Sequence, residues 1–542
     1  AAAAAAAAAA TAVTAPRNSP PHIVMFVIDD VGWADVSARG NYTGMHTPAL
    51  DALMRDGVEL RSMRVQPVCS PTRTALLQGR YPFRKGQGLQ HYSTIKPGSA
   101  AKMPLDQPTI AELLRDYGHY STHAVGKWHA GYAKWEYTPT GRGFLSHKGY
   151  FQGQIDYFNK TFSIPHGFLP GINITGLDWW HNRQSVSDER GRHNKYLYDA
   201  AADAVLDAYT PTDKSPLFLY YAHQIAHFPI EPPRAPHFAD GCAKLHAAAD
   251  GATTTTYAAR RYRYCANMAA LDDSLARLVA KLKAKGMWNN TVLVVTSDNG
   301  GLPAVAGEYP SSAGSNWPLR AGKGRCFDGG VRVVAAVGGG AVPASARGRV
   351  VDGTAALMHA VDWFPTLAGR AGDVVRAAVP ANVDGIDLWP VITGARVPNA
   401  SAPLRASLPI DINHAVEYPD SGHRRAIVTA DGFKLIERAV TGETLNYDGW
   451  FAPNGTVVPP PAAGANPPGR YLFDLSTDPH EHVNLYAKRP DVVRRLAALL
   501  DAYERQSYQD PQSNFVWPCA FPEVNVINGS QTWAPWLSND PC

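Results

Sequence analysis

The chain has 542 residues, of which 45% are hydrophobic and 18% are charged, and its formal net charge is only +4. That length exceeds the usual size of one domain, so we expect two domains, one of them large. A slight positive charge without a concentrated basic stripe gives no support for nucleic-acid binding. The sequence has no apolar run of about 18 residues and therefore predicts no membrane span.

The first twenty residues form a low-complexity segment. Ten alanines precede the sequence TAVTAPRNSP, with no initiating methionine and no charged start. We interpret residues 1–20 as a tail, of the kind left near a processed signal peptide.

Strands and helices alternate from residue 21 to about residue 400. Each predicted strand is a short, continuous apolar run, as expected where a parallel sheet buries both of its faces. The predicted strands are 22–28, 58–65, 122–125, 216–221 and 291–296, and the predicted helices are 47–57, 74–78, 108–117 and 262–285. This alternation predicts an α/β fold in which a mostly parallel sheet lies between helices.

The character of the sequence changes near residue 400. Short strand patterns occur at 425–429, 433–437 and 471–475, and 490–505 has the pattern of a helix. The Pro-, Gly- and Ala-rich stretch 457–468 predicts a surface loop. We therefore predict a large domain over 21–400 and a smaller C-terminal α+β domain with an antiparallel sheet over 401–542.

Polar residues follow the ends of several predicted strands. Asp29, Lys127, His227 and Asp298 all stand at such positions. In open α/β sheets that edge is where ligands bind, so four separate loops can converge on one site.

Four oxygen-bearing side chains in these loops form a candidate metal site. Taken alone, Asp29-Asp30 is equally well explained as a turn or a helix N-cap, and Asp298-Asn299 as a turn. Taken together they supply hard oxygen ligands, which suit Ca²⁺ or Mg²⁺. No spacing of Cys and His predicts zinc.

Cys69 opens the most distinctive segment of the chain, CSPTRTALLQGR over residues 69–80. A lone cysteine is most often a small buried residue or half of a disulfide. Here Pro71, Arg73 and Gly79-Arg80 stand at fixed offsets from it, a pattern that resembles the type I sulfatase signature, Cys-x-Pro-x-Arg followed by Leu-x-Gly-Arg.

The resemblance to type I sulfatases covers about residues 21–400. The matching segments are 66–69, 88–91, 126–129, 288–291, 316–320, 329–332 and 384–385, with more generic similarity at 472–475, 478–479 and 484–485. Within the family, the motifs resemble those of arylsulfatase B. The resemblance implies an alkaline-phosphatase-like fold for the large domain.

The resemblance also implies how the site works. Cys69 would be oxidised to formylglycine by a formylglycine-generating enzyme, and one Ca²⁺ would be held by an oxygen of modified Cys69 with the four metal-site residues. The remaining implied roles fall to cationic side chains: Arg73 and Lys127 would steady the formylglycine, and His129, His227 and Lys323 would contact sulfate. His227 or Lys323 would protonate the leaving oxygen. His223 is the alternative to His227 on residue type alone.

The activity implied is hydrolysis of sulfate esters of aryl or sugar alcohols, with a sulfated small molecule or glycan as substrate. Two alternatives remain. The first is a phosphonate or phosphodiester hydrolase of the same superfamily, and the second is a non-catalytic protein that binds sulfated glycans.

The other cysteines and the glycosylation sequons indicate a secretory route. Cys242 with Cys265, and Cys519 with Cys542, are plausible local pairs that would leave Cys326 free, although connectivity cannot be deduced from sequence. Asn-x-Ser/Thr sequons occur at Asn41, Asn159, Asn173, Asn289, Asn399, Asn454 and Asn528. We expect a glycoprotein of the lysosome or the cell exterior.

Overall fold

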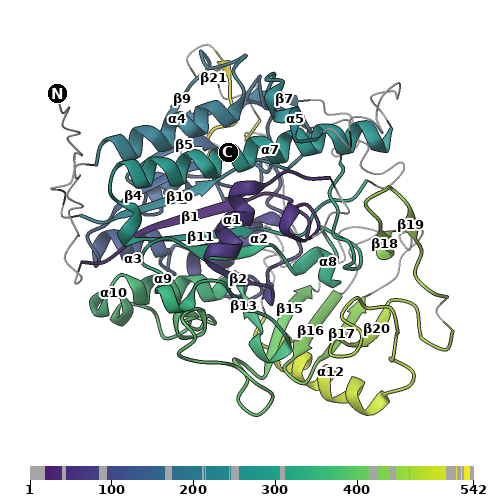
Figure 1. Ribbon diagram of the computed structural model, residues 1–542. Coiled ribbons are helices and arrows are strands. Elements are labelled where there is room, and N and C mark those ends of the chain that lie inside the picture. The colour runs from purple at the N-terminus through teal and green to yellow at the C-terminus, as the bar shows by residue number, and fades with distance from the viewer. Residues whose placement is uncertain are drawn as a thin grey trace, which may run out of the picture.

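A computed structural model gives the fold (Figure 1). It describes residues 19–39, 44–84, 94–164, 174–209, 213, 215–242, 245, 256–304, 312–413, 424–438, 447–462, 464–507, 520–521, 526–527 and 530–537.

A ten-stranded sheet forms the centre of the molecule. From one edge to the other its strands are β13 (Arg349–Val351), β2 (Val58–Leu60), β12 (Ala335–Gly338), β11 (Thr291–Ser297), β1 (His22–Ile28), β10 (Leu217–Ala222), β4 (Ser121–Lys127), β5 (Ser146–Tyr150), β8 (Trp180–His181) and β9 (Gln184–Ser185). The central strands β11, β1, β10, β4 and β5 are parallel, whereas β12 and the β8–β9 hairpin run antiparallel to their neighbours. The sheet is mixed but mostly parallel.

The register of the central strands aligns their carboxyl ends. Ile28 at the end of β1 pairs with Ser297 at the end of β11. Ala222 at the end of β10 pairs with Gly126, the residue before the end of β4. Parallel strands in such a register present the residues that follow them at one edge of the sheet.

Helices cover both faces of the sheet (Figure 1). One layer contains α1 (Pro48–Asp56), α4 (Asn194–Asp207), α5 (His237–Asp240) and α7 (Tyr257–Ala284), and the other contains α2 (Cys69–Gln78), α3 (Ile110–Asp116), α9 (Trp363–Arg370) and α10 (Asp373–Ala377). The short helix α8 (Asp328–Val331) precedes α9 in the chain, and the short helix α11 (Trp389–Ile392) follows α10. The predicted α/β architecture is therefore confirmed.

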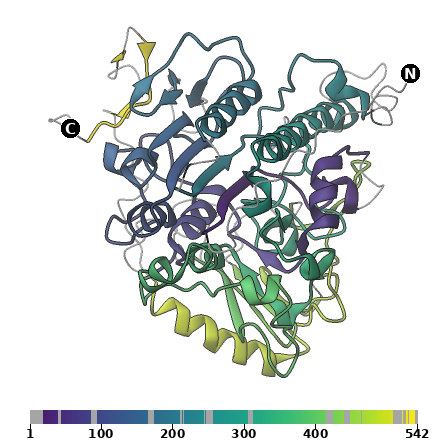
Figure 2. The same ribbon diagram turned by 60° about the vertical axis from the view of Figure 1, so that its left-hand side comes forward.

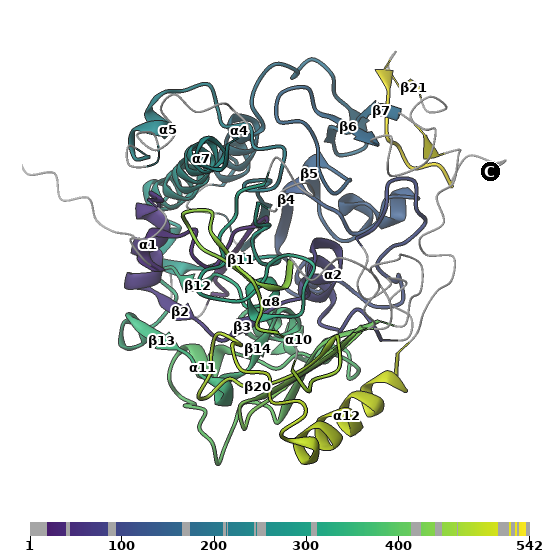
Figure 3. The same ribbon diagram turned by 90° about the vertical axis from the view of Figure 1, so that its right-hand side faces the viewer.

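A second, antiparallel sheet follows in the C-terminal part. Its strands, in order, are β15 (Ser407–Asn413), β16 (Arg424–Thr429), β17 (Phe433–Arg438) and β20 (Arg470–Asp474). Helix α12 (Pro490–Glu504) packs on this sheet, and Figure 3 shows it on the side away from the ten-stranded sheet. The predicted antiparallel sheet is confirmed, while the domain boundary at residue 400 stays a prediction.

Small two-stranded units complete the described part of the chain. They are β3 (Met63–Arg64) with β14 (Met358–His359), β6 (Thr161–Ile164) with β7 (Ile174–Leu177), β18 (Trp450–Phe451) with β19 (Val457–Val458), and β21 (Val526–Ile527) with β22 (Ser530–Gln531). The last described segment returns to the large lobe, as the yellow strands at the upper left of Figure 2 show. There the Trp533 amide donates to the Leu177 carbonyl and the Trp536 amide to that of Ala133.

Several predicted bounds are wrong; the helix expected over 262–285, for example, spans Tyr257–Ala284. The helix expected over 74–78 begins five residues earlier, with Cys69 as the first residue of α2. Pro71 reads as a helix breaker, yet proline is tolerated in the first turn because its missing N–H would have no intrahelical partner there. The strand expected over 58–65 is divided into β2 and β3, because a turn interrupts it at Arg61-Ser62.

The predicted disulfide between Cys242 and Cys265 is present, and Cys326 is a buried free thiol. Cys519 and Cys542 lie outside the described residues. The four described sequon asparagines, Asn159, Asn289, Asn399 and Asn454, are exposed; Asn41, Asn173 and Asn528 lie outside the described residues. Within the described ranges, the helices are too short or too polar to cross a bilayer.

Candidate active site

The residues predicted for the site come together at the carboxyl edge of the large sheet. Asp29 and Asp30 follow β1, Asp298 and Asn299 follow β11, Lys127 ends β4 with His129 two residues later, and His227 follows β10. Cys69 and Arg73 lie on α2, and Lys323 lies on the connection from β11 to α8. All of these residues are buried except Lys323, whose side chain is 12% exposed.

Three cationic side chains pair with the three carboxylates. Lys127 Nζ lies 2.7 Å from Asp29 Oδ2, and Lys323 Nζ lies 2.6 and 2.8 Å from the two oxygens of Asp30. Arg73 donates through Nε and Nη2 to Asp298 Oδ2, at 3.0 and 2.8 Å.

A further Arg73 bond joins the helix to the sheet. Its Nη1 donates to the Lys127 carbonyl at 3.1 Å, which ties α2 to the end of β4. Charges buried this deeply are tolerated only when paired and hydrogen-bonded, so the cluster is internally neutralised.

The side chain of Cys69 faces this cluster. Its Sγ lies 3.8 Å from Asp29 Oδ1. Burial, only partly offset by Lys127 and Lys323, raises the pKa of the thiol to about 12. A thiol with that pKa is almost entirely protonated at neutral pH, and the protonated form is a poor nucleophile. The residue is therefore badly suited to act as an ordinary catalytic cysteine.

The electrostatics of the two adjacent aspartates differ. Burial and the charge of Asp298 raise the pKa of Asp29 to about 7, against the opposing effect of Lys127 and Arg73. Burial would also raise the pKa of Asp30, but the ammonium of Lys323 holds it well below its usual range. Burial alone would lower the pKa of Lys323, whereas Asp30 holds it well above the usual value.

The donor set fits a hard divalent cation. Asn299 donates through Nδ2 to Asp30 Oδ1 and to the Gly300 carbonyl, so its Oδ1 is the free acceptor. That oxygen is buried and has no hydrogen-bond partner among the described residues. A buried, unpaired oxygen beside three carboxylates is the kind of ligand that Ca²⁺ takes.

His227 lies among the carboxylates of the candidate metal site, whereas the resemblance implied only a contact with sulfate. Donor atoms of Asp29, Asp30, Cys69 and His227 all lie within 4.8 Å of one another, and His227 Nε2 is 3.8 Å from Asp30 Oδ2. Its Nδ1 is 2.7 Å from the Phe228 carbonyl. A carbonyl can only accept, so Nδ1 carries the proton and Nε2 keeps a lone pair. The sequence alone could not show that His227 lies within reach of the carboxylates as well as of a bound sulfate.

The other two histidines of the prediction have different surroundings. His129 Nε2 is 3.2 Å from the Ile95 carbonyl, and its buried Nδ1 has no partner among the described residues. His223 Nδ1 accepts the Ile225 amide at 3.0 Å, and its ring packs against Tyr198 and Tyr221. Burial lowers the pKa of all three histidines, including His227.

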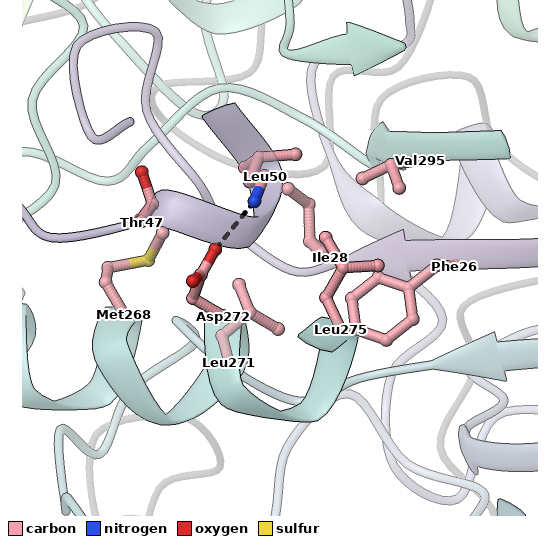
Figure 4. Close-up of a pocket in the computed structure, with 9 residues that line it drawn as sticks. All are labelled: Phe26, Ile28, Thr47, Leu50, Met268, Leu271, Asp272, Leu275 and Val295. Carbon is pink, nitrogen blue, oxygen red and sulfur yellow. Dashed lines mark hydrogen bonds between the residues drawn. The ribbon is translucent and has the colours of Figure 1, made fainter. Parts of the chain in front are cut away.

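The cavity in Figure 4 is separate from this cluster. It lies between α1 and α7 and is lined mainly by apolar side chains, among them Leu50, Met268 and Leu275. Its one charged member, Asp272, accepts the Leu50 amide at 2.8 Å. With a volume of about 10 Å³, it is no larger than the space that one water needs.

Comparison with known proteins identifies the family. A family model described as Sulfatase matches residues 21–373. Arylsulfatase J of Mus musculus is 30% identical over 549 residues, covering 96% of this chain and 81% of the relative. Arylsulfatase A of Bos taurus is 30% identical over 482 residues, covering 86% and 83%. N-acetylgalactosamine-6-sulfatase of Mus musculus is 29% identical, covering 69% and 66%.

These relatives do not single out arylsulfatase B. The comparisons therefore support the sulfatase family as a whole and not the specific resemblance to arylsulfatase B that the motifs suggested. Two solved structures support the fold alone, because their identities are low. A crystal structure of Ps i-CgsB in complex with k-i-k-neocarrahexaose has a TM-score of 0.68 at 24% identity, covering 92% of this chain and 96% of that chain. Phosphonate monoester hydrolase of Agrobacterium radiobacter has a TM-score of 0.54 at 19% identity, covering 89% and 96%. The family model spans more than half of the sequence, and the chain therefore belongs to the sulfatase family.

Proposed function

We propose that this protein hydrolyses sulfate esters of aryl or sugar alcohols, using formylglycine made from Cys69 and one bound Ca²⁺. The observation that carries the proposal is the setting of Cys69. A deeply buried thiol, protonated at neutral pH, faces carboxylates and cations contributed by separate strands. A thiol in these surroundings is a poor nucleophile, whereas an oxygen nucleophile beside a metal ion would be stabilised there.

Asp29, Asp30, Asp298 and Asn299 would hold the calcium ion with an oxygen of the modified Cys69. Formylglycine supplies the oxygen nucleophile that a thiol lacks, and calcium supplies positive charge beside it. Conversion of Cys69 requires a formylglycine-generating enzyme as a partner during synthesis.

Arg73 and Lys127 would steady the formylglycine, and His129, His227 and Lys323 would contact the sulfate group. Arg73 and Lys127 are fixed by their bonds to Asp298 and Asp29, so they provide positive charge that need not reorganise during the reaction. Lys323 reaches the site from the connection between β11 and α8. Asp30 keeps its pKa well above the usual value, so the ammonium stays protonated and can donate a hydrogen bond to the leaving oxygen.

The two histidines differ in what they can do. His227 is neutral, with its proton on Nδ1, so its Nε2 can take a proton from a hydroxyl of the site. His129 donates through Nε2 and keeps an unpaired Nδ1. We therefore assign His227 to proton acceptance, and the hydrogen bond to the leaving oxygen to Lys323.

We also propose that the protein follows the secretory route to the lysosome or the exterior. The Cys242–Cys265 disulfide and the exposed sequon asparagines support this.

The test combines mass spectrometry with kinetics. Protein from a host that converts cysteine to formylglycine is digested, and the mass of the peptide containing Cys69 is measured. We expect the mass of the formylglycine form. Hydrolysis of 4-nitrophenyl sulfate is then compared with that of 4-nitrophenyl phosphate. Cys69→Ala should abolish turnover, whereas Cys326→Ala, at the other buried free thiol, should keep it.

Other outcomes separate the alternatives. An active protein with unmodified Cys69 would refute the proposed nucleophile. Faster hydrolysis of the phosphate ester would point to a phosphoryl hydrolase. Binding of sulfated sugars without release of alcohol would indicate a non-catalytic binding protein.

A further inference from the structure

The segment that carries Lys323 has an unusual set of contacts. We define the Lys323 loop as residues 320–325, on the connection between β11 and α8. On one side it contacts the large lobe, where the Lys323 amide donates to the Gly301 carbonyl at 3.1 Å and the Gly324 amide to the Pro67 carbonyl at 2.8 Å. Pro67 stands two residues before Cys69, so the loop abuts the turn that leads into the candidate nucleophile.

On its other side the same loop contacts the C-terminal part of the chain at nearly every step. The Ala321 amide donates to the Gly449 carbonyl at 2.8 Å. The Tyr447 hydroxyl donates to the Lys323 carbonyl at 3.0 Å. Arg424 Nη1, on β16, donates to the Gly324 carbonyl at 2.6 Å.

Asp448 adds a charged contact to this set. Arg325 Nε donates to Asp448 Oδ1 at 3.2 Å, and the Arg325 guanidinium lies over the Tyr447 ring. The carboxylate of Asp448 is fully buried and also pairs with Arg438 of β17. Through Asp448 the loop is thus joined to the C-terminal sheet.

Arg320 makes the deepest of these contacts. Its guanidinium is enclosed by aromatic rings, with its central carbon 4.2 Å from the ring centre of Phe327, 4.8 Å from Trp450, 5.2 Å from Tyr471 and 5.5 Å from Phe473. Its Nε donates to the Asp448 carbonyl at 2.7 Å and its Nη1 to the Glu481 carbonyl at 2.9 Å. A planar guanidinium can stack and donate at once, so this arginine is held in one orientation.

Fixing Arg320 also restricts the position of Lys323, because the two residues are close in the chain. Lys323 lies three residues after Arg320, and its ammonium reaches both oxygens of Asp30. A lysine side chain is flexible, so its ammonium is placed accurately only if its backbone is fixed. Three of the hydrogen bonds that fix this backbone come from Arg424, Tyr447 and Gly449, 100 or more positions later in the chain. They add to those made within the large lobe.

We propose that the C-terminal part of the chain anchors the Lys323 loop, and that Arg320 and Tyr447 are positioning residues for Lys323. This inference rests on the proposed function, in which Lys323 acts on the leaving oxygen. Figure 3 shows α8, which follows the loop, beside the C-terminal sheet. The C-terminal part of the chain therefore has a role in the reaction without touching the reacting atoms.

The test uses two variants and a matched control in the full-length, calcium-loaded enzyme. Tyr447→Phe removes only the hydroxyl, and Arg320→Lys removes the planar stack and one of its two carbonyl bonds. Arg425→Lys is the control, because Arg425 is the residue after Arg424 on β16 but pairs with Glu437 and Glu504. Circular dichroism and thermal midpoints verify that each variant is folded.

The first measurement does not depend on activity. Amide hydrogen exchange of the peptide covering 320–325 should speed up about tenfold in both variants and stay unchanged in Arg425→Lys. Unchanged exchange in both variants would overturn the anchoring.

The second measurement is kinetic. Losing one hydrogen bond of the loop should lower kcat on 4-nitrophenyl sulfate about threefold to tenfold in Tyr447→Phe, with a larger loss in Arg320→Lys. KM should change little, because the contact of Lys323 with the leaving oxygen strengthens only in the transition state. Faster exchange with wild-type kcat would overturn the positioning role.

A double-mutant cycle shows whether Tyr447 acts through Lys323. In a Lys323→Ala background, Tyr447→Phe should have almost no further effect on kcat. An undiminished loss in that background would refute the inference. Failure of the proposed function is distinguishable, since it would appear as a wild-type enzyme without sulfatase activity.

Discussion

Replacing Lys434 with methionine should weaken the junction between the two sheets. Lys434 lies on β17 with its side chain fully buried, and its Nζ is 2.7 Å from both Asp328 Oδ1 and Glu481 Oε1. Asp328, the first residue of α8, is also held by Arg64 at 2.8 Å. Lys434 thus connects the C-terminal sheet to the helix that follows the Lys323 loop.

The expected cost follows from what the substitution leaves behind. Methionine fills similar space but cannot pair with the two carboxylates. Breaking a buried ion pair on one side typically costs about 3–5 kcal/mol, because a charge stays buried without its partner. Asp328 keeps Arg64, so most of the cost should arise at Glu481.

The cost should depend on pH in a defined direction. Burial already raises the pKa of Glu481 above its usual 4.5, with Lys434 opposing the shift. Removing Lys434 raises that pKa further. A carboxyl whose pKa is raised on folding contributes stability below its unfolded pKa and loses it as the pH rises through the folded pKa. The deficit of Lys434→Met should therefore be larger at neutral pH and shrink toward pH 4.5.

The assay is urea unfolding at pH 7 and pH 5, with the variant compared with wild type at each pH. Lys434→Met/Glu481→Gln is the matched control. Removing both charges should recover at least half of the deficit at pH 7. A deficit below about 1 kcal/mol at pH 7, or one equal at both pH values, would refute the reasoning.

Three further outcomes are expected. Calcium at about one hundred times its Kd should raise the free energy of unfolding by about 2.7 kcal/mol, and Asp30→Asn should lose most of that gain; equal gains would argue against the site. Replacing both Cys242 and Cys265 with alanine should cost about 3 kcal/mol, measured by thermal unfolding, because the disulfide closes a loop across 23 positions; an unchanged midpoint would contradict this. Gly126→Ala should lower the yield of folded protein, because Gly126 has φ +98° and an added Cβ would lie 1.9 Å from the Ala222 carbonyl oxygen; normal yield and activity would disprove it.

The local sequence carried enough information for most elements of the large sheet. The β-branched run 22–28 forms β1 with the expected bounds, and 291–296 forms all but the last residue of β11. Such strands are buried on both faces, so their composition alone is distinctive. Prediction was weaker at the start of α2, because proline is tolerated in the first turn of a helix and Pro71 therefore does not mark where the helix begins.

The residues of the candidate site were also accessible to sequence reasoning. Parallel strands deliver the residues after them to one edge, so Asp29, Lys127, His227 and Asp298 could be grouped before their distances were known. The sequence could not determine which cation meets which carboxylate. Pairing of Lys127 with Asp29, and of Lys323 with Asp30, depends on side-chain directions that separate segments acquire only on packing.

The sequence by itself therefore determined the order of elements, the chemical types at the site and the distinctive motif around Cys69. The tertiary structure decided the protonation and pairing of those groups, because burial and opposing charges act through space. It also decided the partners of Arg320, since the rings and carbonyls that enclose it come largely from residues 448–481. No local pattern encodes a contact between segments so far apart in the chain.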